Sequence, residues 1–162
     1  MNSRFLPVLA IAPFVMSGCA GTGSPATPSA AAEAVVIPLQ ATSFNAGNVG
    51  RVTLLPLEGG TSILLDFTGV PADTTLPVHV YTYLYESACD ALPARPASSL
   101  NRTVLVTNPD GGLAYRVRGS FSLAHTSPLP MDDLLSGRFS IALRSAPADG
   151  GRVIYCGELR HA

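Results

Sequence analysis

The clearest signal of the fold is one ten-residue stretch, Leu76-Pro77-Val78-His79-Val80-Tyr81-Thr82-Tyr83-Leu84-Tyr85. It is rich in β-branched and aromatic residues, which favour β-strands. Successive side chains of a strand point to opposite faces, so the stretch predicts two different surfaces. The aliphatic surface should face a core, and its members are Val78, Val80, Thr82 and Leu84.

The opposite surface, the His–Tyr face, consists of His79, Tyr81, Tyr83 and Tyr85. These residues can pack as ordinary amphipathic strand residues under the loop that follows, at 86–101. Alternatively, they form a binding surface, since tyrosine is enriched at protein interfaces. His79 alone has three interpretations: a packed strand residue, part of that binding surface, or a metal ligand.

Similar alternation, punctuated by Gly, Pro, Asn and Asp, recurs through the rest of the chain. The pattern predicts strands at 35–40, 50–57, 61–67, 76–85, 102–107, 113–123, 137–144 and 152–159. Turn residues stand at 58–60 and 108–112, and residues 131–135 predict a single helical turn. About eight strands with short turns indicate an all-β fold, an antiparallel sandwich or barrel.

The amino-terminal residues follow another pattern. Arg4 gives a basic start, residues 5–15 are apolar, and Ser17-Gly18-Cys19 comes next. This order is typical of a secretory signal peptide, and the apolar run is shorter than the roughly 20 residues of a membrane span. Ser-Gly-Cys resembles the lipobox of bacterial lipoproteins, although Met16 departs from the usual Leu, Val or Ile. The alternative is an ordinary signal peptide with a chance cysteine.

The lipobox resemblance implies cleavage before Cys19 and lipid, such as palmitate, on the new terminus, which would anchor the protein to a membrane. Residues 20–34 are rich in Gly, Ser, Thr, Pro and Ala and predict a flexible tether. The chain then divides into a signal peptide at 1–18, a lipidated tether at 19–34 and a β-barrel domain at 35–162. Ala20 after the cysteine implies, by resemblance to enteric lipoproteins, an outer-membrane protein facing the periplasm or the cell surface.

The charge of the chain limits the classes of partner, and its cysteine content indicates how the cysteines are used. The net charge is −1 and the chain contains no lysine, so we expect no nucleic-acid partner. If Cys19 carries lipid, Cys89 and Cys156 remain as a pair, and an oxidising compartment favours a disulfide between them. A zinc or redox site is the alternative, but it lacks a CxxC spacing and sufficient ligands.

Several short motifs, in order, resemble the copper,zinc superoxide dismutase superfamily, an eight-stranded Greek-key barrel. Residues 65–71 resemble its strand that ends in Gly-Leu-Pro, and Val78-His79-Val80-Tyr81 stands in the place of its Phe-His-Val-His. Residues 135–138 resemble its Ile-Ile-Gly-Arg, and residues 151–157 its closing Gly-x-Arg-x-x-Cys-Gly. The resemblance implies this barrel for most of residues 41–159.

The metal ligands of that superfamily do not carry over. Its copper site uses four histidines, and its zinc site adds two more histidines and an aspartate. Here Tyr81 stands at the second ligand position, and the chain contains only His79, His125 and His161. We therefore expect no metal, no cofactor and no catalytic residue, and we expect His125 and His161 to be exposed to solvent.

These observations predict a non-catalytic envelope lipoprotein that acts as a binding or scaffold module through the His–Tyr face and the loop that carries Cys89. Its partners would be the membrane, through Cys19, and an unidentified envelope protein or ligand. One alternative is a divergent metal-binding enzyme of the superoxide dismutase type, with ligands from Tyr81, His125 or acidic residues. Another is an inhibitor of a cell-wall hydrolase such as lysozyme.

Overall fold

The computed structural model describes residues 33–107 and 112–161. The predicted signal peptide, Cys19, most of the tether and most of the turn predicted at 108–112 lie outside this range. No helix within the described part of the chain is long and apolar enough to cross a membrane.

Nine strands make up about half of the described chain. They are β1 (Val35–Ala41), β2 (Gly50–Leu57), β3 (Gly60–Thr68), β4 (Val78–Tyr85), β5 (Ser98–Ser99), β6 (Leu105–Thr107), β7 (Ser120–Ser127), β8 (Ser136–Ser145) and β9 (Val153–Arg160). The helical elements are short: α1 (Gly112–Arg118), α2 (Met131–Leu134), and the 3-10 turns η1 (Ser43–Asn45) and η2 (Pro147–Asp149).

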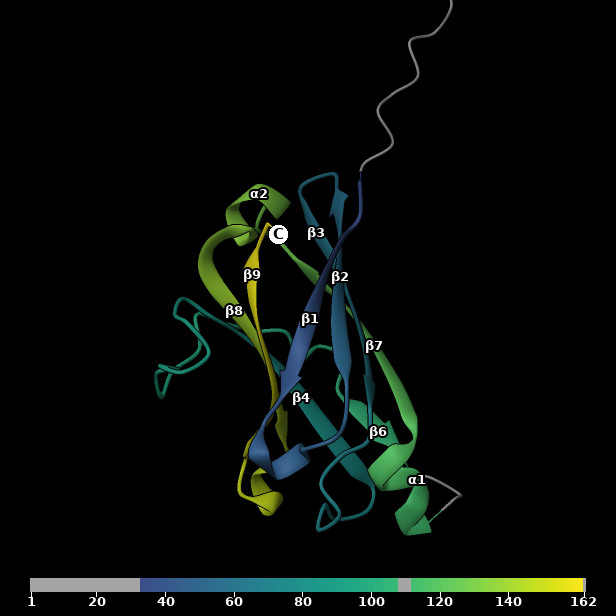
Figure 1. Cartoon of the computed structure of the whole chain (residues 1–162). Helices are drawn as coiled ribbons and strands as arrows, with labels where there is room; N and C mark the ends of the chain where they lie inside the picture. The colour runs from purple at the N-terminus through teal and green to yellow at the C-terminus, as the bar shows by residue number, and fades with distance from the viewer. Residues whose placement is uncertain (1–32, 108–111, 162) are drawn as a thin grey trace, which may run out of the picture.

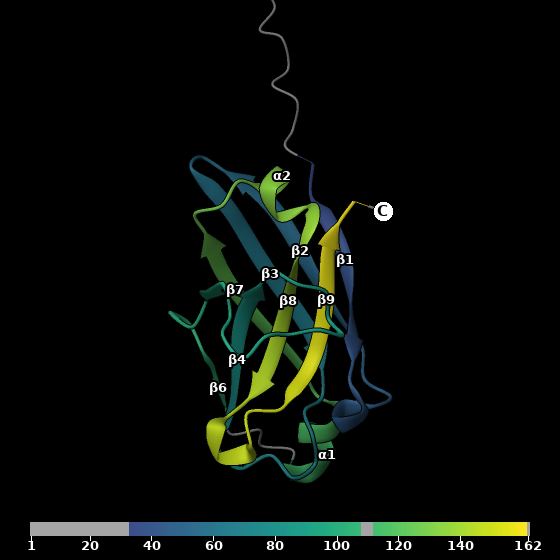
Figure 2. The ribbon, with the colours of Figure 1, turned by 90° about the vertical axis from the view of Figure 1, so that its left-hand side faces the viewer.

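All strand pairs are antiparallel, and their order is β5-β4-β8-β9-β1-β2-β3-β7, with β6 also paired to β4. The sheet has two halves, one with β2, β3 and β7 and the other with β9, β8, β4, β5 and β6. Strand β1 joins them, because residues 35–39 pair with β2 and residues 40–41 pair with β9. The sheet thus curves around one core as a half-barrel (Figures 1 and 2). Strand β1 begins at the same end of the half-barrel as α2 and the carboxyl terminus.

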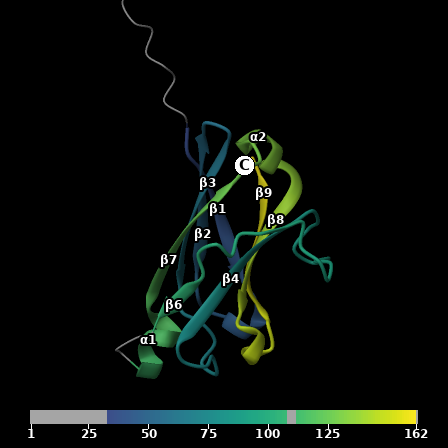
Figure 3. The same cartoon turned by 180° about the vertical axis from the view of Figure 1, so that it is seen from behind.

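The half-barrel is not closed on its other side. Strand β7 and the segment 98–107, which runs along β4, are the two ends of the strand order, and no strand pairing joins them within the described residues. We call this boundary the open seam, and the pairing of β1 with β9 the closed seam. Figure 3 views the molecule from behind and shows β7, β6 and β4 on this side.

The all-β prediction is confirmed, and so is the predicted inward face of β4: Val78, Val80, Thr82 and Leu84 are at most 1% exposed. The predicted helical turn is α2. The prediction of a strand from residue 113 is wrong, because residues 112–118 form α1 and β7 begins only at Ser120. The helix is held from a distant part of the chain, since the Val70 amide donates to the Arg116 carbonyl at 2.7 Å.

The predicted disulfide between Cys89 and Cys156 is present and ties the loop after β4 to β9. It lies in a small apolar cluster of its own, with Tyr85, Ala142 and the partly buried Tyr83. The main core lies between the two halves of the sheet. There the Tyr155 hydroxyl donates to the Thr68 carbonyl, and burial raises the pKa of Tyr155 to about 12.

Candidate functional site

The structure divides the His–Tyr face into two parts. His79 and Tyr81 are partly exposed, and the His79 Nδ1 atom lies 2.8 Å from the Pro77 carbonyl oxygen. Tyr83 and Tyr85 have ring centroids 6.4 Å apart, and Tyr85 is only 1% exposed. Tyr85 packs in the cluster around the disulfide and is not available to a partner, because the Cys89 loop is held there. For the other three residues, a role in binding stays a prediction.

His125 is buried, and the prediction that it is exposed is wrong. Strand β7 extends to Ser127, and alternation places His125 on its inward side with Phe121 and Leu123. The His125 Nε2 atom lies 3.0 Å from the Thr82 hydroxyl, which comes from β4 on the other side of the core. Burial lowers the pKa of His125, so the imidazole is neutral near pH 7.

These residues do not fit the copper and zinc centre of superoxide dismutases. His79 and Thr82 occupy positions of opposite parity on β4, so His79 points away from the side on which His125 contacts Thr82. His161 is exposed, as predicted. Within residues 33–107 and 112–161, no group of three His, Cys, Asp or Glu side chains is placed to hold a metal ion.

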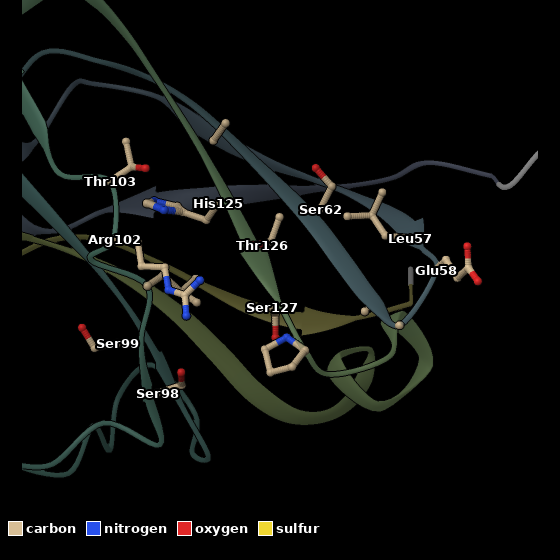
Figure 4. Close-up of a pocket in the computed structure, with 15 residues that line it drawn as sticks. Leu57, Glu58, Ser62, Ser98, Ser99, Arg102, Thr103, His125, Thr126 and Ser127 are labelled. Atoms are coloured by element: carbon tan, nitrogen blue, oxygen red, sulfur yellow. The ribbon is translucent and has the colours of Figure 1, made fainter.

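The open seam contains a pocket of about 780 Å³ (Figure 4). One wall is the segment 98–103, and the other consists of the β2–β3 hairpin and residues 124–128. Most polar side chains in the lining carry neutral hydroxyl groups: Ser62, Ser98, Ser99, Thr103, Thr126 and Ser127. Arg102 and Glu58 are the charged residues of the lining, and His125 contributes from its buried position.

Sequence reasoning missed this pocket. A signal was present in β7, where the alternate residues Ser120, Ser122, Ala124 and Thr126 are small and the residues between them are larger. That alternation predicts a strand with one buried side. It does not reveal that the strand lacks a second neighbour, because this depends on the arrangement of the whole sheet.

The other conspicuous charged groups support the fold. Arg152 donates to the Asp73 carboxylate at 2.7 Å and lies 5.0 Å from the centre of the Phe44 ring. The hydrogen bond from Arg152 lowers the pKa of Asp73. Asp132 and Asp133 are exposed in α2, as expected for a solvated turn.

Comparisons of this chain with protein-family models, with curated proteins and with solved structures find no match.

Proposed function

We propose that the chain is a bacterial envelope lipoprotein, anchored through lipid on Cys19, whose domain is a non-catalytic binding module of the superoxide dismutase type. The observation that carries the binding role is the open seam. In the part of the chain that the structure describes, the half-barrel of nine strands is not closed on one side, and the polar side chains of the pocket there are mainly neutral hydroxyl groups. Such groups bind a ligand through hydrogen bonds.

The strand order supports the superoxide-dismutase-like part of the proposal. Strand β8 lies beside β4, although β5, β6 and β7 come between them in the sequence. A Greek key made of β4, β6, β7 and β8 would have the spatial order β8-β4-β6-β7, in which the fourth strand returns to the side of the first. The observed neighbours β8-β4-β6 match three members of that order, whereas β7 pairs with β3 and not with β6 among the described residues. The missing contact, between β6 and β7, is the open seam.

The surroundings of the histidines support a non-catalytic role. His125 is neutral and hydrogen-bonded to Thr82, while His79 lies on the other side of β4. A copper site needs several imidazoles around one point. Neither histidine has such neighbours among the described residues.

The anchor is tested on the full-length chain expressed in a bacterial host. We expect the wild-type protein to fractionate with membranes and its amino-terminal peptide to begin with an acylated Cys19. The matched variant Cys19→Ser should carry no lipid. A wild-type protein released without lipid would contradict the anchor.

The non-catalytic role is tested by offering copper and zinc to the purified full-length protein. We expect metal contents well below one ion per chain and no dismutation of superoxide. Stoichiometric copper that is lost in the variant His79→Ala would overturn the proposal and support an enzyme.

The binding role is tested in cells with a photo-crosslinking residue at Ser99 or Thr126, on the two walls of the open seam. A probe at Tyr81 tests the His–Tyr face, and a probe at Arg138, exposed on β8, is the control. We expect an adduct from the open seam and none from Arg138. No adduct from any of these positions would contradict a binding module.

One observation favours a second function, inhibition of a cell-wall hydrolase. The loop between β4 and β5 projects from the half-barrel (Figures 1 and 3) and is fixed at Cys89 by the disulfide. A projecting, covalently fixed loop is suited to entering the cleft of an enzyme. Inhibition of lysozyme by the full-length protein, lost in the variant Cys89→Ser, would support this function.

A further inference from the structure

We infer that the free edge of β7 is the contact site of this module, and that its partner is an extended peptide segment that adds to β7 as a strand and places an acidic side chain against Arg102. The inference rests on the binding function proposed above. It adds the position of the site, the class of partner and the mode of binding.

The ladder between β3 and β7 shows which backbone groups of β7 are free. The pairing of Thr68 with Ser120 continues to Gly69, whose amide donates to the Gly119 carbonyl at 2.7 Å. In an antiparallel ladder, every second residue directs both its N–H and its C=O to the same neighbour. Odd-numbered residues of β7 therefore bond to β3, and Ser122, Ala124 and Thr126 direct their backbone groups away from it.

The pairing of β3 with its other neighbour, β2, leads to the same assignment of odd-numbered and even-numbered residues. The Thr68 amide donates to the Val49 carbonyl at 2.8 Å, so even-numbered residues of β3 bond toward β2. Odd-numbered residues of β3 must then bond toward β7, as deduced above. Among the described residues, no backbone partner is found for the outward groups of Ser122, Ala124 and Thr126. They offer three donors and three acceptors.

This edge lacks the usual protection. Natural edge strands carry charged residues, proline or a bulge that prevents pairing with another chain. Strand β7 contains no proline and no Asp, Glu, Lys or Arg, and its register with β3 is unbroken over eight residues. Among the described residues, a hydrogen bond to the outward backbone is found at the first residue, where the Tyr115 hydroxyl lies 3.4 Å from the Ser120 carbonyl oxygen. The remaining edge is suited to strand addition.

The pocket provides the space for such a strand. It lies between residues 124–128 and the segment 98–103, so an added strand would have a wall on each side. The segment 98–103 uses its inner side for β4, since Leu100 donates to the Thr82 carbonyl at 3.0 Å. The lining contains no Phe, Tyr or Trp side chain on which a sugar ring would stack, and its imidazole, from His125, is buried. Extended peptide backbone is therefore the ligand that the walls match best.

The charges of the lining favour particular side chains on the partner. The two charged residues, Arg102 on the segment 98–103 and Glu58 on the β2–β3 hairpin, lie at opposite ends of the pocket (Figure 4). Arg102 is exposed, and no ion pair or hydrogen bond of its side chain is found within the described part of the chain. In Figure 4 its guanidinium group points from the segment 98–103 into the space beside Ser127. A carboxylate on the peptide can form a bidentate pair with this group.

The experiment is amide hydrogen exchange of the full-length protein in detergent, followed by NMR, with and without a short synthetic peptide. The peptide alternates valine and threonine and carries one central aspartate; a second peptide carries lysine instead. We expect the aspartate peptide to slow exchange of the Ser122, Ala124 and Thr126 amides at least about tenfold. The amides of Leu123 and His125, which bond to β3, should not change.

Two variants separate the backbone from the charge. Ala124→Pro removes one outward N–H group without removing a hydrogen bond to β3. In this variant the amides of Leu123 and His125 should still exchange slowly, but the peptide should no longer protect the outward amides. Arg102→Glu should lower the affinity for the aspartate peptide about two- to fivefold at low salt. The effect is small because exposed charge pairs are weak. Arg95→Glu, the same charge reversal in the exposed loop before β5, is the control and should leave binding unchanged.

Four outcomes would overturn the inference. Protection that is absent up to the solubility limit of the peptide, or that occurs elsewhere on the protein, removes β7 as the site. Equal binding of both peptides removes the role of Arg102. Protection of the edge that depends on protein concentration, without peptide, identifies a second copy of the chain as the occupant. In-cell adducts from Tyr81 but not from Thr126 would sustain the proposed module while refuting this site.

Discussion

The closed and open seams are built from different interactions. At the closed seam, the backbones of β1 and β9 pair directly, Gln40 with Cys156 and Ala41 with Tyr155. Thr42 extends this contact, because its amide donates to the Ile154 carbonyl at 3.1 Å and its hydroxyl to the Val153 carbonyl at 2.7 Å. The disulfide further joins β9 to the loop after β4.

At the open seam, the halves of the sheet meet through side chains. The contact between His125 and Thr82 crosses the core near the pocket, while the outward backbone groups of β7 are left over. At the closed seam, hydrogen bonds between β1 and β9 use the backbone groups and stabilise the fold. At the open seam, a side-chain contact holds the two halves together, so the outward backbone groups of β7 can bind a partner.

Removing the disulfide should have the largest effect. The double variant Cys89→Ser/Cys156→Ser opens a loop with a sequence separation of 67 residues. In the chain-entropy model this lowers the free energy of unfolding by about 4 kcal/mol. Guanidinium unfolding of both proteins measures the difference. Equal midpoints would show that the closed seam does not depend on this bond.

The close approach of β1 and β9 can be tested with Gly157→Ala. A Cβ atom at Gly157 would lie 2.7 Å from Leu39 Cδ2 and 3.1 Å from the Pro38 carbonyl oxygen. We expect a loss of about 1–3 kcal/mol in unfolding free energy, because the added methyl overpacks the site. In a Leu39→Ala background the same change should cost less. An unchanged melting temperature in the wild-type background would show that the strands separate easily.

The contact across the open seam is tested with Thr82→Val. The variant keeps the shape of the residue but leaves the buried His125 Nε2 atom without its hydroxyl partner. We expect a loss of about 1–2 kcal/mol. Thr82→Ser retains the hydroxyl and should cost less than Val. The opposite ranking in thermal or urea unfolding would assign the role of Thr82 to packing alone.

The smallest effect should be a dependence on pH that comes from His125. Burial lowers its pKa in the folded state, so the unfolded chain binds more protons below its own pKa of about 6.5. The stability from neutral His125 is complete above that pH and is lost as the pH falls. The free energies of unfolding of wild type and His125→Gln, measured in urea, should therefore become more similar as the pH falls. Parallel curves would show that His125 does not titrate differently in the two states.

Local patterns were sufficient for much of the fold. The inward face of β4 followed from its alternation, and the disulfide followed from the number of cysteines and the expected compartment. Residues 115–118 also alternate apolar and polar side chains, but they belong to a helix that bonds to Val70 far away in the sequence. Local alternation cannot reveal such a long-range bond.

The candidate site was harder to predict than the fold. The predicted strand ends at Leu123, and the Ser and Pro residues that follow indicate a loop, so His125 was expected to be exposed. Strand β7 instead pairs with β3 over eight residues, and this register places the His125 side chain on the inward side. The open seam depends on which strands remain without a neighbour, and this is a property of the complete sheet.

The position of β1 in both halves of the sheet determines how the domain would respond to mechanical force. A chain tethered through Cys19 and gripped along β7 would be pulled at β1 and at β7. Tension would then pass through the ladders β1–β2, β2–β3 and β3–β7. The disulfide lies in the other half of the sheet and carries none of this load. Resistance to stretching would therefore come from hydrogen bonds, and it would be the same in oxidised and reduced protein as long as both are folded.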